Sequence, residues 1–362
     1  MTETKARNAK QPCEPLRLLH VVPAIGIGGV EIAAHCAAER LGGNLQVQSL
    51  SPSPVSPDEA SPEPWMSYGR AGNPLDIRNA FSAVRTAREF NPDVIIFSLW
   101  KTILAFLLMR LLLRDRKFVL FVHSDRSAHM VERLATSVMA RLSHAVWADS
   151  ASTLEGRLGQ RRQQMRTRVI SFILYKPPAV VREKPKPVFA YWGRLNKVKR
   201  VKDAIDLFHR IASKRPDSRF IIIGPDSGTR QELEDQVHAL GLDGRVEFAG
   251  SMRMPEIAAA TTHASFFVQL SKQEGVAMSV IEAMQLGLVP VVTPVGEIRD
   301  YCKDGVNSII FSEMESAAES IDALLDDADR FRRISSSAIS QWKDAPLYDA
   351  DLITAARELC AA

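Results

Sequence analysis

The chain has 362 residues, enough for two domains of ordinary size, and 46% of them are apolar, so it can bury a core. Its four cysteines, Cys13, Cys36, Cys302 and Cys360, are too scattered for a disulfide framework or a zinc site, and a reducing cytoplasm is the expected compartment. Residues 1–15 are polar, which argues against a signal peptide and predicts a disordered tail.

The formal net charge of +4 is unevenly divided along the chain. Residues 1–180 hold 23 Lys and Arg against 15 Asp and Glu, and the remainder holds 23 against 27. A basic first half can attract an anionic partner or an anionic membrane surface, although an ordinary solvated face gives the same counts. Nucleic acid is not expected as a partner.

Short apolar runs alternate with amphipathic stretches in the first half. The expected strands are 16–22, 45–50, 92–97, 118–122 and 145–149, and the expected helices are 32–41, 76–90 and one that Ser150 begins as N-cap. This alternation predicts a parallel, doubly wound sheet, in which ligands bind at the carboxyl ends of the strands. Gly28 and Gly29 follow the first of these strands, and His123 follows the fourth. The two glycines would let backbone approach a ligand, whereas a lone His at a strand end is equally compatible with a structural role.

The most apolar run, 103–113, is too short to span a bilayer and is interrupted by Arg110. Arg114, Arg116 and Lys117 follow it. Two interpretations stay open at this point: a buried helix of the sheet, or an amphipathic surface that touches anionic lipid.

The second half repeats the alternation after a proline-rich stretch, 170–187, that reads as an interdomain linker. The expected strands are 188–192, 219–224, 245–248, 264–270 and 288–292, and the expected helices are one from Val201, 256–261, 316–340 and 348–360. Within this half, the stretch 271–290 combines a strand end, a tight loop and a helix start, the arrangement in which phosphates bind to free amides.

Two carboxylates flank the tight loop in this stretch. Glu274 precedes the turn Gly275–Val276–Ala277, and Glu282 lies one to two turns into the helix that follows. A ligand with phosphates on the amides near Ala277, Met278 and Ser279 could present a pair of sugar hydroxyls to each carboxylate. A loop carboxylate and a surface helix Glu would look the same in sequence, except that a Glu on so apolar a helix needs a partner.

Two cations mark the loop after the strand 188–192. Arg194 and Lys199 lie in Gly193-Arg194-Leu195-Asn196-Lys197-Val198-Lys199, directly before an expected helix. Arginine offers a fork of donors to a phosphate and lysine a mobile point charge, so this pair could stabilise a diphosphate leaving group. A basic surface loop is the plainer interpretation.

These motifs together resemble the retaining family-4 glycosyltransferases of GT-B fold. The matching residues are Glu274, Gly275, Glu282, Ala283, Met284, Gly287, Val289, Pro290, Val291 and Val292, the segment Gly193-Arg194-Leu195 with Lys199, and Gly28-Gly29 with Glu31. Ala277 stands where the family usually carries a second glycine, and Arg200 stands where a glycine usually follows the lysine.

The resemblance implies two Rossmann-like α/β domains that face each other across a cleft. The first, 16–180, would bind the acceptor, the second, 181–345, would bind a nucleotide diphosphate sugar, and a final helix in 346–362 would return to the first. It implies that Gly28 and Gly29 lie near the donor phosphates or the acceptor and His123 beside the donor sugar. Glu282 would take the ribose diol, and Glu274 would hold sugar hydroxyls or stabilise oxocarbenium-like charge.

The expected activity is transfer of a hexose, with retention of anomeric configuration, to a glycan or lipid-linked acceptor in bacterial polysaccharide or lipopolysaccharide assembly. No cofactor or divalent metal is expected, because the cations would neutralise the leaving group. The expected location is cytoplasmic, with a peripheral position on the inner face of the membrane as a further hypothesis. Two alternatives remain: a nucleotide-sugar epimerase of similar fold, which paired first-domain carboxylates would favour, and a non-catalytic sugar- or membrane-binding partner.

Overall fold

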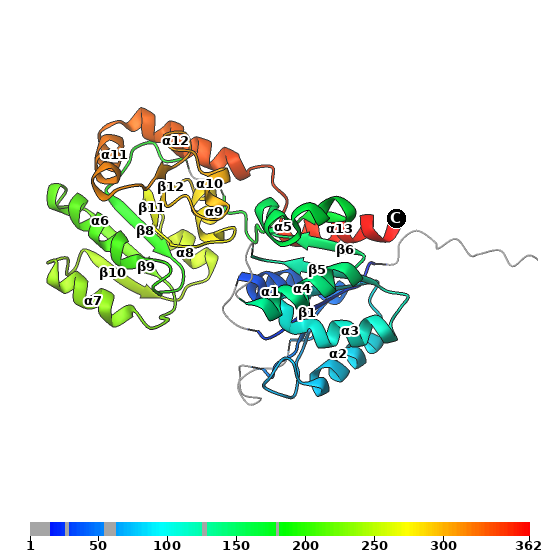
Figure 1. Cartoon of the computed structure of the whole chain (residues 1–362). Helices are drawn as coiled ribbons and strands as arrows, with labels where there is room; N and C mark the ends of the chain where they lie inside the picture. Colours follow the sequence, from blue (N-terminus) through cyan, green and yellow to red (C-terminus); the bar gives the residue numbers. More distant parts are fainter. Residues whose placement is uncertain (1–14, 26–28, 54–62, 125–128, 179–180) are drawn as a thin grey trace, which may run out of the picture.

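The structure is a computed structural model that describes residues 15–25, 29–53, 63–124, 129–178 and 181–362. Gly28 and all but the last residue of the expected tail 1–15 therefore lie outside the described residues. Two parallel sheets, each flanked by helices, organise the described chain (Figure 1).

The first sheet has seven strands in the order β3-β2-β1-β4-β5-β6-β7, and all of its neighbours pair in parallel. The strands are β1 (Leu18–Val22), β2 (Leu45–Ser49), β3 (Met66–Ser67), β4 (Val94–Ser98), β5 (Lys117–Val122), β6 (Ala145–Ala148) and β7 (Thr167–Val169). Its helices are α1 (Gly29–Leu41), α2 (Ile77–Phe90), α3 (Ile103–Leu112), α4 (Met130–Leu142) and α5 (Ala151–Leu158).

The second sheet has six strands in the order β10-β9-β8-β11-β12-β13, again all parallel. The strands are β8 (Val188–Trp192), β9 (Arg219–Ile223), β10 (Val246–Gly250), β11 (Phe266–Gln269), β12 (Val289–Val292) and β13 (Ile309–Ile310). The remaining helices are α6 (Val201–Lys214), α7 (Arg230–Ala239), α8 (Met254–Ala260), α9 (Met278–Gln285), α10 (Ile298–Tyr301), α11 (Met314–Asp326), α12 (Ala328–Trp342) and α13 (Tyr348–Ala361).

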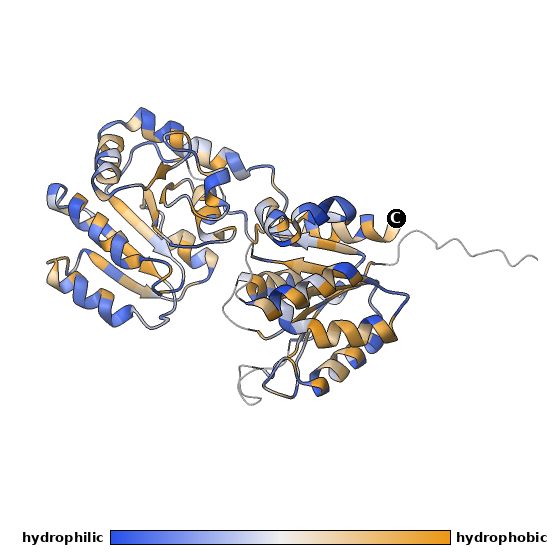
Figure 2. Ribbon diagram, in the orientation of Figure 1, coloured by the Kyte–Doolittle hydropathy of each residue, from blue (hydrophilic) through white to orange (hydrophobic). Residues whose placement is uncertain are grey.

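The strands are apolar on both faces because helices cover both faces of each sheet, as a parallel sheet requires. In β1, Leu18 and Val22 join one buried cluster, whereas Leu19 and Val21 join another on the opposite face. The second sheet likewise separates two buried clusters. Figure 2 shows the apolar strands enclosed by helices with hydrophilic outer residues.

Helix α13 packs on the first sheet, although it follows the whole of the second in sequence (Figure 1). Tyr348, Leu352 and Leu359 belong to the same buried cluster as β1 and β5. The Tyr348 amide donates to the Ile173 carbonyl at 2.9 Å, and Arg168 pairs with Asp351 at 2.7 Å.

The predicted α/β class with two doubly wound parallel sheets is confirmed. Ser150 also caps α5 as predicted, accepting from the Thr153 amide at 3.1 Å. One prediction of secondary structure is wrong: the expected helix 316–340 is two helices, because Asp327 ends α11 and its side chain accepts from the Arg330 amide to begin α12. The strands β3, β7 and β13 and the helices α4 and α7 were not predicted.

Candidate functional site

The candidate residues of the second domain gather where its strand order reverses. Strands β8 and β11 are neighbours in the sheet, and the chain continues from them in opposite directions. The loops that leave their carboxyl ends therefore open a crevice, the usual ligand site of such sheets. Arg194 and Lys199 lie in the loop after β8, and Glu274 and Gly275 lie in the loop after β11.

Glu274 and Lys199 form an ion pair across this crevice. Lys199 Nζ lies 2.6 Å from Glu274 Oε1, and the two side chains are only 17% and 9% exposed. Gln269, the last residue of β11, donates to the same Oε1 at 2.8 Å and accepts from the Ser279 hydroxyl at 2.6 Å. The network ties the Glu274 loop to the first turn of α9.

Glu282 lies further along α9 and has a partner, as its apolar helix requires. The Trp192 indole N–H, at the end of β8, donates to Glu282 Oε2 at 2.8 Å. Burial raises the pKa of Glu282, and the Trp192 hydrogen bond, which favours the carboxylate, partly offsets that effect. The second carboxylate oxygen stays available to a hydroxyl donor.

The start of α9 has the backbone shape of a phosphate-binding turn. Ala277 is the N-cap residue and adopts a left-handed φ of 57°. Among the described residues, the amides of Met278 and Ser279 have no hydrogen-bond acceptor, which leaves them free for an anion. Gly275, in the turn before them, is exposed.

Arg194 is exposed at the edge of the same crevice. Its guanidinium has no hydrogen-bond or ion-pair partner within the part of the chain that the structure describes, whereas its carbonyl accepts from the Tyr191 hydroxyl at 3.1 Å. The loop therefore presents one cation held in an ion pair, Lys199, and one cation without a partner among the described residues, Arg194.

The first domain meets this crevice from the other side. A Cβ built on Gly29, at the start of α1, would lie 3.2 Å from Met278 Sδ, and one built on Gly275 would lie 3.6 Å from the His123 carbonyl oxygen. Glu297 accepts a hydrogen bond from the amide of Ser152, in the first turn of α5, at 3.0 Å. The first turns of α1 and α9 thus face each other between the domains.

The His123 imidazole is held inside the first domain. Its side chain is 5% exposed, its Nε2 lies 2.9 Å from the Ser98 hydroxyl, and its Nδ1 lies 3.6 Å from Asp149 Oδ2. Of the predicted site residues that the structure describes, those of the second domain converge on one crevice, and Gly29 and His123 lie on the first-domain side of it.

Several residues that build this crevice were missed from the sequence. Trp192, Gln269, Ser98 and Asp149 each lie at or directly after a strand end, next to a predicted site residue. The strand order that brings them together is the signal that was lacking, because it is a property of the sheet and not of any one segment.

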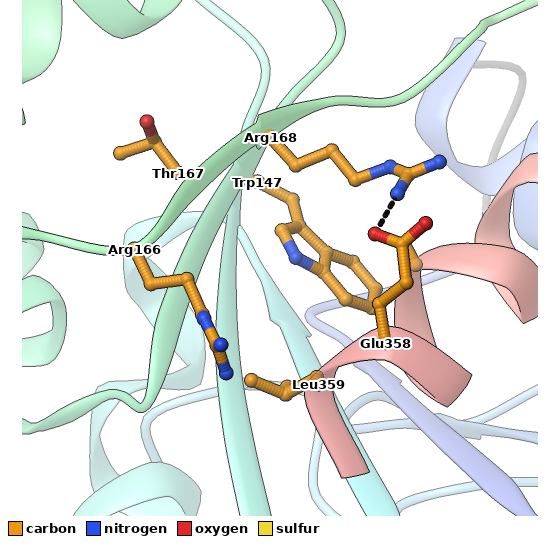
Figure 3. A pocket seen from close by; sticks show the side chains of 7 residues that line it. Trp147, Arg166, Thr167, Arg168, Glu358 and Leu359 are labelled. Carbon is orange, nitrogen blue, oxygen red and sulfur yellow. Dashed lines mark hydrogen bonds and ion pairs between the residues drawn. The ribbon is translucent and has the colours of Figure 1, made fainter. Parts of the chain in front are cut away.

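A cavity of about 330 Å³ lies elsewhere, between β6, β7 and α13 (Figure 3). Arg166, Arg168 and Glu358 line it, and Arg168 pairs with Glu358 across one side. None of its lining residues belongs to the candidate site.

Within the described ranges, no group of three or more His, Cys, Asp or Glu residues is arranged to hold a metal ion. Over the same ranges, every helix is too short or too polar to cross a membrane.

Residues 176–341 match the family described as "Glycosyl transferases group 1". Among curated relatives, a GDP-mannose:cellobiosyl-diphosphopolyprenol alpha-mannosyltransferase of Xanthomonas campestris is 26% identical over 143 residues, which are 39% of this chain and 38% of that protein. The alpha-D-kanosaminyltransferase of Streptomyces kanamyceticus is 26% identical over 155 residues, 42% and 40% of the two chains. These matches therefore span less than half of either relative.

The likeness to solved structures extends over nearly the whole chain. Anabaena HepE in complex with UDP and glucose matches with a TM-score of 0.73 at 19% identity, over 96% of this chain and 100% of that one. A glycosyltransferase from Rickettsia africae matches with a TM-score of 0.73 at 15% identity, over 96% and 99%. At such identities the likeness establishes the fold. The chain therefore has the GT-B fold, and its residues 176–341 match the glycosyl transferases group 1 family.

Proposed function

We propose that this chain is a glycosyltransferase that moves a hexose from a nucleotide diphosphate sugar to a glycan or lipid-linked acceptor. The observation that carries the proposal is the crevice after β8 and β11, which Lys199, Arg194 and the free amides at the start of α9 border with anion-binding groups. The curated relatives named above are glycosyltransferases, and HepE has been solved with UDP and glucose.

In the proposed reaction the diphosphate lies on the α9 amides between Arg194 and Lys199. As the glycosidic bond breaks, negative charge develops on the leaving diphosphate, and the two cations, of which Lys199 is already held in place, stabilise that charge. Glu274 would hold the sugar hydroxyls or stabilise positive charge on the sugar ring, and Glu282 would take the ribose diol. Because these cations neutralise the leaving group, we propose a reaction without a divalent metal or other cofactor.

We further propose retention of anomeric configuration and a place in bacterial cell-surface polysaccharide or lipopolysaccharide assembly. The support is the motif resemblance and the mannosyltransferase relatives, which act on a diphosphopolyprenol. The discriminating assay is product analysis with a labelled donor: an anomer-retained glycoside supports the proposal, and free sugar formed without acceptor supports the epimerase alternative.

The first test is nucleotide binding followed by thermal unfolding. UDP, GDP, ADP and CMP are each added with and without magnesium to the unsubstituted chain, to Arg194→Ala and to Arg219→Ala. Arg219 is a matched control because it is exposed at the opposite, amino end of the neighbouring strand β9. A ligand at one hundred times its dissociation constant adds about 2.7 kcal/mol of stability.

We expect one diphosphate to raise the melting temperature independently of magnesium, with the shift lost in Arg194→Ala and kept in Arg219→Ala. The absence of any shift with all four nucleotides would reject the transferase and favour a non-catalytic partner.

An apolar, basic face of the first domain supports an anionic membrane surface as the place of action. The outer sides of α2, α3 and α4 expose Phe81, Leu111, Met130 and Leu134, with Met130 86% exposed. Helix α3 packs between α2 and α4, so these residues belong to adjoining helices (Figure 2). Over 77–90, 101–117 and 130–142 there are ten Lys and Arg against three Asp and Glu. Apolar side chains among excess cations fit an interface of anionic lipid.

We propose that this face, the α2–α3–α4 face, binds the inner surface of the cytoplasmic membrane. Flotation with phosphatidylglycerol vesicles tests it, with phosphatidylcholine vesicles as the uncharged comparison. The triple variant Leu111→Ser, Met130→Ser, Leu134→Ser should lose binding, whereas Val306→Ser, an exposed apolar residue of the second domain, should keep it. No binding to phosphatidylglycerol at low salt would refute this part of the proposal.

A further inference from the structure

A row of four polar side chains crosses the first sheet, one from each of four neighbouring strands. His20 lies within β1, Ser98 ends β4, and His123 and Asp149 directly follow β5 and β6, in the spatial order of the sheet. His20 Nε2 lies 2.8 Å from Ser98 Oγ, which lies 2.9 Å from His123 Nε2, and His123 Nδ1 lies 3.6 Å from Asp149 Oδ2. Such a row is unusual here because the other side chains of these strands are almost all apolar.

The carboxylate of Asp149, at one end of the row, sets the direction in which the hydrogen bonds of the row run. A carboxylate accepts and does not donate, so the His123 nitrogen that faces it carries the hydrogen. His123 Nε2 is then a bare acceptor for the Ser98 hydroxyl, and Ser98 in turn accepts from His20 Nε2–H. In the reverse order, two lone pairs would face each other between His123 and Asp149, and His20 would bury an unpaired Nδ1–H.

His20 can end the row because it stays neutral. It is fully buried, and burial, followed by the nearby His123, lowers the pKa of His20 to about 3. A charged His20 would repel a charged His123, whereas a neutral imidazole supplies one donor to Ser98.

Ser98, His123 and Asp149 stand in the order of a nucleophilic triad, but Ser98 cannot attack a substrate. The side chain is fully buried, and its hydroxyl oxygen is shared with His20. The row is therefore suited to holding His123 and not to covalent catalysis.

The backbone at one end of the row lies against the crevice. Leu99, directly after Ser98, has a φ of 65°, which is rare for leucine and typical of strained functional loops. The His123 carbonyl lies against the Gly275 turn, and Asp149 directly precedes Ser150 and α5, whose first turn binds Glu297 of the second domain. Both His123 and Asp149 thus adjoin the contact between the domains.

The His123–Asp149 contact is incomplete. Within the described residues, His123 Nδ1 and Asp149 Oδ1 are buried without a hydrogen-bond partner, and 3.6 Å is too long for a hydrogen bond. Buried unpaired atoms are rare in native proteins, and each needs an explanation.

We propose that Asp149 and Ser98 are positioning residues that hold the His123 imidazole in its Nδ1–H tautomer, and that this anchors the His123 backbone against the Gly275 turn. The proposal rests on the proposed function, since a donor sugar is the ligand expected against this turn. An imidazole fixed in one tautomer and one orientation keeps the adjoining backbone in place, so the sugar meets that backbone without reorganisation.

The test that is independent of any ligand is the His123 tautomer, measured by NMR on chain labelled with ¹⁵N-histidine. We expect Nδ1 protonated and Nε2 bare in the unsubstituted chain, and a shift toward the Nε2–H form in Asp149→Asn. Asp243→Asn is the matched control because Asp243 faces His238, 3.1 Å away, in an exposed pair. An Nε2–H form in the unsubstituted chain, or no change in Asp149→Asn, would overturn the proposal.

A second experiment distinguishes a positioning role of Asp149 and Ser98 from a merely structural one. Calorimetry compares UDP with UDP-glucose and GDP with GDP-mannose. Asp149→Asn and Ser98→Ala should weaken the sugar nucleotide about tenfold and the bare nucleotide by less than about twofold, since only the sugar is expected against the His123 backbone. Equal weakening of both would overturn the proposal. Failure of the unsubstituted chain to bind either nucleotide would instead reject the proposed function, and the NMR result would still decide the role of Asp149.

Discussion

At the residue scale, Ala277 holds a backbone shape that alanine tolerates poorly. Its left-handed φ of 57° begins α9 and turns the free amides of that helix toward the crevice. An L residue with a Cβ loses about 1–2 kcal/mol in this conformation, whereas glycine adopts it readily. The departure from the family's glycine therefore keeps the turn and lowers stability.

Replacing Ala277 with glycine should cost less than the same change inside the helix. In Ala277→Gly the relief of backbone strain offsets the lost methyl packing, whereas Ala283→Gly, buried in the middle of α9, loses packing and helix propensity together. We expect Ala277→Gly to unfold with a free energy at least about 1 kcal/mol higher than Ala283→Gly in urea titrations. Equal losses in the two variants would contradict this reading of the turn.

His20 makes the stability of the first domain depend on pH. Its pKa is lowered to about 3 by burial, while in the unfolded chain it returns to its ordinary value. Below about pH 6.5, His20 is protonated in the unfolded chain but not in the native chain. The free energy of unfolding therefore falls as the pH drops toward 3, by up to about 1.4 kcal/mol per pH unit. His20→Gln should flatten the urea-denaturation free energy between pH 6.5 and 4.5; an unchanged slope would mean that His20 is protonated in the native chain.

The residues that carry charge were predictable, and their partners were not. Glu274, Arg194 and Lys199 could be singled out because they follow strand ends, where ligands bind in parallel sheets, although ordinary surface loops carry the same residue types. Trp192, Gln269 and His20 look like ordinary strand residues. Their roles depend on which strands are neighbours, and the pairing of β8 with β11 or of β1 with β4 joins segments about 75 residues apart.

At the scale of elements, the loop that carries Glu274 is held by a second loop. Gly296, with a φ of 56°, packs so closely that a Cβ on it would lie 2.3 Å from the Glu274 carbonyl oxygen and 2.6 Å from that of Gly275. The next amide, of Glu297, donates to the Gly275 carbonyl at 3.0 Å. The segment before α10 thus sets the position of the β11–α9 loop.

Gly296→Ala should therefore displace the Glu274 loop as well as strain its own backbone. We expect a loss of about 2–4 kcal/mol of unfolding free energy and weaker binding of the nucleotide identified above. Gly305→Ala is the control, since Gly305 has a similar φ of 66° and open space around its Cβ position. It should lose only about 1 kcal/mol and bind normally. Equal behaviour of the two variants would show that the close approach at Gly296 has no effect on the site.

The longer strands were predictable and the shortest edge strands were not. Strand β8 was expected at 188–192 and is found there, because a continuous apolar run bounded by proline and glycine has few alternatives. β3 and β13 have two residues each and β7 has three, too few to show any periodicity. They form only because a completed sheet offers them an edge.

At the scale of the whole molecule, each domain has a buried core of its own, which stabilises that domain. Leu352 of α13 is buried in the core of the first domain, and Leu324 of α11 is buried in the core of the second. The return of α13 to the first domain could not be read from its own sequence, since an amphipathic helix fits either domain.

Leu352→Ala and Leu324→Ala should therefore weaken different halves of the molecule. Each change should cost about 2–5 kcal/mol, because a buried leucine leaves a cavity. Hydrogen exchange should quicken in β1 and β5 for Leu352→Ala, and in β8 and β11 for Leu324→Ala. Faster exchange in both sheets of either variant would mean that the domains unfold together.

The position of α13 has a consequence for how the chain is made. The second sheet is complete, with its helices, once residue 342 has been added, whereas the first lacks the cover supplied by Tyr348, Leu352 and Leu359 until α13 follows. Because the ribosome releases the chain from the amino end, the strands of the first domain emerge early, and α13 emerges only after the whole second domain. The domain that is translated first is thus the last to close its core, and in the interval the apolar patch around β1 and β5 is exposed, as in aggregation-prone folding intermediates.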